Sequence, residues 1–508
     1  MKDSIFKEKY ISRVILVIAS MVSLYSFYFF TSNKVYLIGS DQYYYMSIAD
    51  SIIQNGEMRD LTFVPSRPIK SPQNGIAFVH VLLSLLGLSH KAGQLVIVFI
   101  NYMAYLGGIY PLLMISRHFG LTKKLPLVAL LSVYLGAWHI YRINLLAIND
   151  GIFNSLILWL AYFFIKFFHS SNELSSFLLS RNTAKIYLTI IFLTIVSIQF
   201  RVTAILVIGS AVIGGVIVRN YRASVWSLLG VTLMLLSIFS IFHTFVGVSP
   251  LDITHFKLSE NFRELFSNVV SYKIKLILWK ILPRLTAGLS PLSNSFATLC
   301  FTVFPLSMLY CLYRGYIEKN FSKIFLALIC LTGLWFTLKY SNARVIFYTF
   351  PFIYLLLLGH RKTRFIAYVF VLLVFLQSFQ TFFQGFRRMP GSKLFLHIYE
   401  NNISLPDYNP LLLTSEAAHT YYFLNVRAFK SKLNSDGIVR IPDELNWVSV
   451  ENKKIIYVLG DSNYVNSAYS QVQEMAASNG YKIQTKPLTP DLDEFEGWAL
   501  VEMKVDKF

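Results

Sequence analysis

Charged residues and cysteines are both scarce in this chain. Only 14% of its 508 residues are charged, about half the usual share of a soluble domain, while 55% are hydrophobic. This balance excludes an ordinary soluble fold and predicts that lipid surrounds most of the chain. Cys300, Cys311 and Cys330 show no paired spacing and no histidine partners, so neither a disulfide framework nor a zinc site is indicated.

Long apolar runs stand where charge is lacking. Runs of about 15 to 24 residues recur between Val14 and Phe383, and a helix of about 20 such residues crosses the hydrocarbon core of a bilayer. No small-residue cleavage site follows the first run, which indicates an uncleaved first helix. The shorter run at 77–88 contains His80 and predicts an interfacial or re-entrant helix. About eleven spanning helices are expected, near 14–31, 93–115, 125–141, 151–168, 186–200, 202–218, 224–246, 291–313, 324–339, 345–359 and 365–384, the fifth and sixth being short enough to form a broken pair.

Basic residues set the predicted orientation. Residues 1–399 hold 36 Lys and Arg against 12 Asp and Glu, whereas residues 400–508 hold 10 against 15. The positive-inside rule places the N-terminus and most basic clusters in the cytoplasm, although a long basic loop can still cross the membrane. No basic stripe interleaved with aromatic residues lies in a soluble segment, so nucleic acid is not an expected partner. The outside face then receives the loop 32–91, the turn near Asp150, the loop 247–290, the turn 339–344 and the C-terminal tail.

The acidic tail has the pattern of a small α/β domain. From about residue 387, apolar runs of strand length alternate with helical patterns. The predicted fold class is therefore an all-α polytopic membrane domain over 1–386, which includes the outside loop, followed by an extracytoplasmic α/β domain over 387–508. The expected strands are 410–415, 453–460, 481–485 and 498–505, and the expected helices are 416–430 and 462–480.

One short motif in the tail resembles a catalytic element. Gly460, Asp461 and Ser462 match the Gly-Asp-Ser of certain esterases, whose nucleophilic serine needs a histidine base. No histidine follows His419 in the sequence. We therefore predict that Ser462 caps the helix that follows it.

Acidic residues are rare enough in the apolar body to be informative. Between residues 61 and 251 only Asp150 and Glu173 occur, and Glu173 belongs to a predicted cytoplasmic loop. Asp150 opens an apolar helix, where it is either an N-cap or a functional carboxylate. Asp41 follows the first span and precedes three tyrosines, so it either caps a short helix or is held partly desolvated as a base. Tyr44, in that aromatic cluster, is a candidate for substrate contact.

Four basic residues are the other charged residues of the apolar body that the sequence singles out. Arg67 and Lys70 lie in the first outside loop, where contact with lipid headgroups is the alternative to a functional role. Arg201 lies between two apolar stretches, and Arg344 opens a late span. An arginine at membrane depth needs an anionic partner, unless it extends its side chain to the interface. All four are candidate substrate-binding residues.

The order of these residues resembles that of the GT-C class of membrane glycosyltransferases, particularly its polyprenyl-phosphate-sugar-dependent branch of aminoarabinose and protein mannosyl transferases. In that class an Asp follows the first helix, a Lys-Pro-Pro-like segment precedes an interfacial helix, a second Asp opens the fourth helix, and a late helix begins with Arg and contains Pro. Gln42 and Ser71 depart from the pattern, since many relatives have a second carboxylate and a first Pro there. The matching places, within residues 1–400, are held by Asp41, Lys70 with Pro72, Asp150, and Arg344 with Pro351.

The resemblance implies an inverting glycosyltransferase that uses a polyprenyl-phosphate sugar as donor and an envelope glycan, a lipid or a protein as acceptor. A phosphate leaving group needs cations, here Lys70, Arg201 and Arg344, whereas the acceptor hydroxyl needs a base. Asp41 is the expected base, and Asp150 is expected to orient the acceptor or the base. No cofactor is predicted, and no pattern supports a divalent metal. The expected location is a bacterial inner membrane.

Two other functions remain open on the sequence. A lipid-linked-sugar flippase or transporter would also be polytopic, although internal repeats and midplane charges of the kind usual in such proteins are not seen. An O-antigen ligase or polymerase would use the same donors and is expected to rely on Arg and His in a late outside loop. The loop 247–290, with His255, keeps that function under consideration.

Overall fold

A computed structural model describes residues 13–32, 40–69, 74–121, 124–136, 149–172, 179–232, 305–340, 348–372 and 392–507, apart from single residues and short stretches within these ranges. The chain divides into two compact units. Unit 1 comprises Met1–Tyr36, Lys70–Ile76 and Gln94–Phe386, and unit 2 comprises Leu37–Ile69, Ala77–Gly93 and Arg387–Phe508. Most of the loop 32–91, which the sequence predicts to be outside, thus groups with the C-terminal tail.

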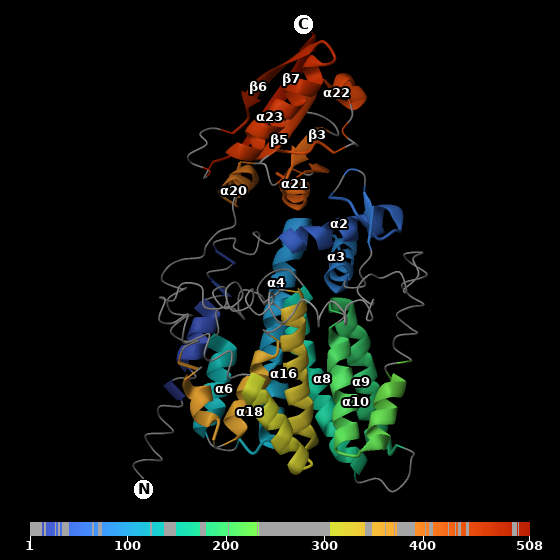
Figure 1. Cartoon of the computed structure of the whole chain (residues 1–508), viewed down its shortest axis with the longest axis vertical. Helices are drawn as coiled ribbons and strands as arrows, with labels where there is room; N and C mark the ends of the chain where they lie inside the picture. The colour runs from blue at the N-terminus through green and yellow to red at the C-terminus, as the bar shows by residue number, and fades with distance from the viewer. Residues whose placement is uncertain are drawn as a thin grey trace. The chain divides into compact units, whose positions relative to one another are not determined.

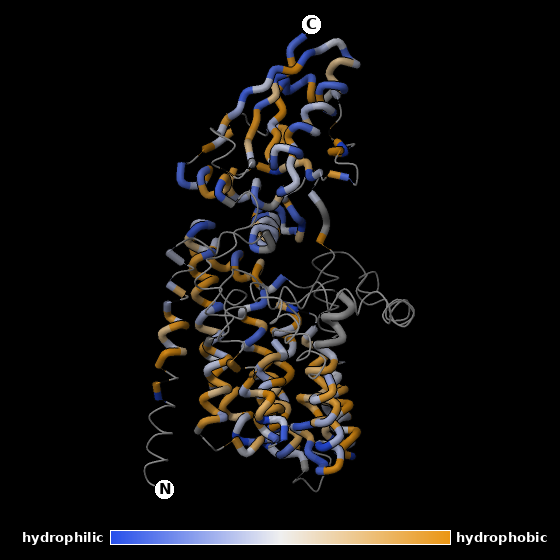
Figure 2. Tube along the Cα trace, turned by 60° about the vertical axis from the view of Figure 1, so that its left-hand side comes forward, coloured by the Kyte–Doolittle hydropathy of each residue, from blue (hydrophilic) through white to orange (hydrophobic). Residues whose placement is uncertain are grey.

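Within the described residues, three helices of unit 1 and its junctions are long and apolar enough to cross a bilayer: His90–His118, Asn149–Ser171 and Arg181–Phe200. The hydropathy colouring of Figure 2 shows that apolar residues dominate the helices of this unit. The third of these helices covers the run predicted as a possible half of a broken pair, and it is long enough to span alone. The expected spans near 14–31, 125–141, 224–246, 291–313, 345–359 and 365–384 lie partly outside the described residues.

The first of these spans consists of two helices, α4 (His90–Gly107) and α5 (Ile109–His118), which meet at Gly108. A Cβ atom at Gly108 would collide with the hydroxyl of Tyr134, on α6 (Lys124–Gly136). Tyr134 stacks on Tyr105 at 4.6 Å, and each hydroxyl donates to the backbone carbonyl of the other residue. Reciprocal hydrogen bonds of this kind satisfy polar groups that lipid cannot solvate, and so they join α4 to α6.

The helices α8 (Asn149–Asn172), α9 (Arg181–Phe200) and α10 (Ala204–Ile217) pack side by side in unit 1 (Figure 1). α16 (Phe321–Tyr340) packs on α10 and on α18 (Phe350–Gly359). Because short connections follow α8 and α9, successive helices run in opposite directions. The start of α8, the end of α9 and the starts of α10 and α18 therefore gather at one end of the bundle.

Aromatic packing marks the other end of the same bundle. Phe168, near the end of α8, stacks on Phe321 at the start of α16, with ring centroids 3.7 Å apart. Gly214, near the end of α10, lets Phe321 approach closely. Asn220 donates to the hydroxyl of Ser171 over 3.0 Å. These contacts fix the relative register of α8, α10 and α16, and hence the positions of their far ends.

Unit 2 contains a five-stranded mixed sheet (Figure 1). Its order is β4 (Phe429–Lys430), β3 (Leu411–Thr414), β5 (Ile455–Asp461), β7 (Trp498–Lys507) and β6 (Tyr481–Pro487). β3 is parallel to both β4 and β5, whereas β7 is antiparallel to β5 and to β6. Four of these strands lie where the sequence predicts strands.

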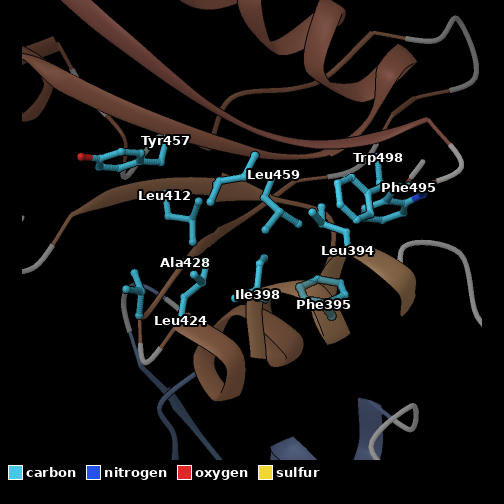
Figure 3. Packing of buried hydrophobic residues seen from close by; sticks show 13 residues of the cluster. Leu394, Phe395, Ile398, Leu412, Leu424, Ala428, Tyr457, Leu459, Phe495 and Trp498 are labelled. Atoms are coloured by element: carbon cyan, nitrogen blue, oxygen red, sulfur yellow. The ribbon is translucent and has the colours of Figure 1, made fainter. Parts of the chain in front are cut away.

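Side chains of the central strands alternate between two hydrophobic cores, because successive residues of a strand point to opposite faces. Leu412 and Leu459 face α20 (Ser392–Glu400) and α21 (Ala417–Leu424), as Figure 3 shows. Their neighbours pack with α22 (Trp447–Lys453) and α23 (Ser462–Ala477) on the opposite face. Burial on both faces explains why β3 and β5 read as continuous apolar runs rather than as alternating ones.

Two details of the tail differ from the sequence prediction. The helix expected over 416–430 ends at Leu424, and Phe429–Lys430 pairs with β3 as a parallel strand instead. The prediction that Ser462 caps α23 is wrong, because the cap is Asp461, whose carboxylate accepts from the backbone N–H of Tyr464 over 2.8 Å. Ser462 donates its hydroxyl to the carbonyl of Gly497 over 2.9 Å. Pairing with β3 decided the first point, whereas the second is a local contact across three residues.

The predicted outside loop forms α2 (Ser40–Asn55), the short antiparallel strands β1 (Arg59–Asp60) and β2 (Arg67–Pro68), and α3 (Gly75–Leu85). α3 has 11 residues, about 16 Å of helix, which is too short to cross a hydrocarbon core of about 30 Å. His80 on α3 is buried, and burial, together with the nearby charge of His90, lowers its pKa to about 3. His80 is therefore neutral at physiological pH and suits the apolar surroundings of α3.

Candidate functional site

An ion pair at one end of the unit 1 bundle joins two of the residues singled out from the sequence. The guanidinium of Arg201 donates to the carboxylate of Asp150. Only 15% of the Arg201 side chain and 6% of the Asp150 side chain are exposed. Asp150 thus supplies the anionic partner that a largely buried arginine needs.

Helix geometry explains why these two residues meet. Asp150 is in the first turn of α8, where a carboxylate also interacts favourably with the helix dipole. Arg201 is the C-cap of α9, and its backbone is extended with φ −154° and ψ 127°. α8 and α9 run antiparallel, so the beginning of the first lies beside the end of the second. The break between α9 and α10 leaves Arg201 free of helical backbone geometry and directs its side chain to Asp150.

Tyr348 completes the surroundings of this pair. Its side chain is 4% exposed and packs edge-on against Phe153 of α8, with ring centroids 5.4 Å apart. Tyr348 lies close enough to Arg201 and Asp150 to interact electrostatically with both, and it also lies close to Thr203. The sequence analysis did not single out Tyr348. The available signal was its position just before Pro351, at the start of a predicted span.

The beginning of α3 is anchored directly beside the ion pair. The backbone N–H of Ile76 donates to the side-chain oxygen of Asn149 over 3.0 Å. Gly75 lies against the ring of Phe200, so close that a Cβ atom there would be 2.8 Å from the ring. Asn149 precedes Asp150, and Phe200 precedes Arg201. The start of α3 therefore contacts the two residues next to the charged pair.

The close contact between Gly75 and Phe200 can be tested by mutation. Gly75→Ala is expected to lower the free energy of unfolding by about 1–3 kcal/mol and to reduce activity, because the alanine methyl group has no room beside Phe200. Phe200→Leu in the same protein should restore much of both by making room. Thermal unfolding in detergent measures the effect. Gly209→Ala is the matched control, since no described atom lies within 4 Å of a Cβ there. A Gly75→Ala protein as stable as the Gly209→Ala protein would contradict the close contact between Gly75 and Phe200.

The other predicted site residues are placed as follows. Asp41 is the second residue of α2, although its side chain is outside the described part. Tyr44 is half-buried on the same helix, and its ring contacts that of Tyr45 at 5.5 Å. Arg67 is in β2, with its side chain also outside the described part, and Lys70 and Arg344 lie outside the described residues altogether. Among the predicted residues whose side chains are described, the structure brings Asp150 and Arg201 together.

No metal site is formed by the part of the chain that the structure describes. Within it, no group of three or more His, Cys, Asp or Glu side chains is close enough to hold an ion. Asp41 and the loop 247–290, which includes His255, are outside this search.

Comparison with solved structures identifies the fold. No protein-family model matches the sequence, and no curated protein matches it. The oligosaccharyltransferase AglB of Archaeoglobus fulgidus, in its apo form, matches with a TM-score of 0.57 and 12% identity over 92% of this chain and 71% of AglB. AglB in complex with an inhibitory peptide and a dolichol-phosphate matches with a TM-score of 0.51 and 12% identity, over 97% and 74% of the two chains.

A third similar structure is ArnT of Cupriavidus metallidurans bound to undecaprenyl phosphate, with 12% identity over 96% of this chain and 97% of ArnT. Its TM-score of 0.47 is too low to support an argument. The likeness to AglB shows that this chain has a GT-C-like glycosyltransferase fold. The resemblance inferred from the order of Asp41, Asp150 and Arg344 is thus confirmed at the level of the fold.

Proposed function

We propose that this protein is a membrane glycosyltransferase that moves a sugar from a polyprenyl-phosphate-linked donor to a glycan, lipid or protein acceptor at the outer face of a bacterial inner membrane. The observation that carries the proposal is the buried Asp150–Arg201 pair at the gathered helix ends of a GT-C-like fold. A buried charge pair costs desolvation energy, so a functional role is a reasonable explanation for its presence at a helix junction.

The donor would be held by cations. Departure of a sugar leaves negative charge on the phosphate, and fixed positive charges stabilise that charge as it develops. Arg201 is held in one position by Asp150. Lys70 precedes the start of α3, which contacts Asn149 and Phe200. Arg67 and Arg344 are further candidates from the sequence. The dolichol-phosphate in one AglB complex supports a lipid phosphate as the group that is bound.

Asp41 would act as the general base. The acceptor hydroxyl oxygen attacks the anomeric carbon, the bond from that carbon to the donor phosphate breaks with inversion, and the hydroxyl proton passes to the Asp41 carboxylate. Tyr44, on the same helix, would contact the substrate. Asp150 would orient Arg201 and, through it, the donor phosphate; this role differs from the one expected from the sequence, in which Asp150 orients the acceptor or the base.

The proposal is tested by supplying the purified protein with a polyprenyl-phosphate sugar and an extract of envelope glycolipids, and by following sugar transfer with mass spectrometry. In parallel, deletion of the gene should remove one sugar unit from an envelope glycan or glycolipid. Loss of whole polymers would instead favour a ligase or polymerase. Accumulation of an unmodified lipid-linked sugar on the cytoplasmic side would favour a flippase.

A further inference from the structure

The helix α2, which carries Asp41, is packed against a helix of the C-terminal tail within unit 2. Tyr43, the second residue after Asp41, is fully buried. Its ring stacks on Tyr422 with centroids 4.6 Å apart and an interplanar angle of 25°. It also contacts His419 at 5.2 Å and Phe423 at 5.6 Å, both edge-on. All three partners belong to α21, so Tyr43 anchors the N-terminal half of α2 to that helix.

The middle of α2 is tied to the short strand that follows it. Asp60 of β1 is 4% exposed, and its carboxylate accepts three hydrogen bonds. They come from the Ser47 hydroxyl over 2.9 Å, the Thr62 backbone N–H over 3.0 Å and the Thr62 hydroxyl over 2.6 Å. Hydrogen bonds to a charged group are the stronger ones, and this set links α2 firmly to the segment around Thr62.

That segment in turn forms backbone hydrogen bonds with the residue that leads into the C-terminal sheet. The Ala428 backbone N–H donates to the Thr62 carbonyl over 3.3 Å, and the Val64 N–H donates to the Ala428 carbonyl over 3.2 Å. Ala428 directly precedes β4, the edge strand of the sheet. The backbone of the predicted outside loop thus pairs with the residue next to this edge strand. The loop is therefore joined to the tail by backbone as well as by aromatic contacts.

The far end of α2 is fixed as well. The Asp50 carboxylate lies 3.3 Å from the ring nitrogen of His90, at the start of α4. The ammonium of the next residue, Lys91, lies over the Tyr399 ring of α20, 4.1 Å from its centroid. A cation over an aromatic face at this distance is attractive. Both ends of α2 thus depend, directly or through one neighbour, on helices of the tail.

We propose that the C-terminal α/β region is a positioning clamp that holds α2, and with it Asp41, in the geometry that sugar transfer requires. This inference rests on the proposed function, because it takes Asp41 as the base. Tyr422 is then a positioning residue that acts through Tyr43 and touches no reacting atom. A displacement of about 1 Å at a reacting group can cost roughly 100-fold in rate, so loss of one anchor should be measurable.

Replacement of the stacking ring tests the clamp. Tyr422→Ala is expected to lower kcat by roughly tenfold or more, with a smaller change in KM for the donor, because the base and not the donor-binding cations would be displaced. Hydrogen exchange should accelerate in α2 and at residues 59–64 while α8 and α9 stay protected. Tyr422→Phe keeps the ring and should stay close to wild type. Tyr481→Phe is a control in the same unit, since Tyr481 contacts Trp447 and Glu451.

A second pair of variants guards against simple misfolding. Asp60→Ala removes the acceptor that links Ser47 to Thr62, whereas Asp60→Asn keeps an oxygen in that place. Asp60→Ala should reproduce the effects of Tyr422→Ala, and Asp60→Asn should show them more weakly. Unchanged exchange of α2 in both alanine variants, or faster exchange with kcat within twofold of wild type, would overturn the clamp.

The clamp and the proposed function fail in different ways. If the wild-type protein transfers no sugar from any polyprenyl-phosphate donor, the proposed function is wrong, while faster exchange of α2 in the Tyr422→Ala protein would still show that the tail holds this helix. If the wild-type protein is active but Asp41→Asn is equally active, the clamp no longer positions a base, and the inference is overturned with it.

Discussion

Asp41→Asn is expected to abolish sugar transfer, with a loss of about 10²- to 10⁴-fold, while the protein remains inserted and abundant. An asparagine has nearly the same shape as an aspartate but cannot take the proton of the acceptor hydroxyl, and general bases typically contribute that much to a rate. The measurement is transfer by purified protein, normalised to the amount that elutes as a single species in detergent.

Glu57→Gln provides the matched control for this substitution. It makes the same chemical change in the same outside loop, at an exposed residue paired with Arg59 over 2.9 Å. Transfer by this variant should match that of wild type. Normal activity in the Asp41→Asn protein would remove Asp41 from the role of base, and equal losses in both variants would point to a general effect of charge in the loop.

Breaking the Asp150–Arg201 pair should have the largest effect on stability. Asp150→Leu or Arg201→Met alone leaves the other charge buried without its counterion, which typically costs about 3–5 kcal/mol. Each single variant should therefore unfold at a clearly lower temperature and transfer little sugar. Thermal unfolding in detergent, together with the transfer assay, measures the two effects on the same preparation.

The double variant Asp150→Leu with Arg201→Met separates stability from chemistry. Replacement of both charges removes the desolvation cost as well as the attraction, so much of the lost stability should return. Activity should not return, because the double variant lacks the Arg201 guanidinium, a proposed cation for the donor phosphate. A double variant that regains transfer along with stability would show that the pair is structural only.

An exposed ion pair in unit 1 provides a reference for the loss of stability at the buried pair. Glu318 lies 2.8 Å from Arg314 and also pairs with Lys323, and its side chain is 30% exposed. The hydrogen bond from Lys323 lowers the pKa of Glu318, so this carboxylate is ionised at neutral pH. Exposed pairs contribute about 1 kcal/mol or less, and Glu318→Gln should accordingly cost far less than either change at the buried pair.

Much of the architecture follows from the sequence, because lipid requires long apolar helices and tolerates few charges. That rule made Asp150 and Arg201 conspicuous, and each proved to be the start or end of a helix. The strands of the tail could also be predicted from the sequence, since a strand buried on both faces is a short continuous apolar run. These features depend on local composition and period, which a single sequence contains.

Contacts between distant residues were decided by the tertiary structure alone. No local pattern pairs Arg201 with Asp150 in particular, 51 residues away, or places Gly75 against Phe200. The sequence also could not show that the backbone of the predicted outside loop hydrogen-bonds to Ala428. A sequence pattern reports which face of an element is apolar, but which elements meet depends on packing and strand pairing throughout the chain. The sequence therefore determined the candidate charges and the membrane helices, and only the tertiary structure decided which of those charges are partners.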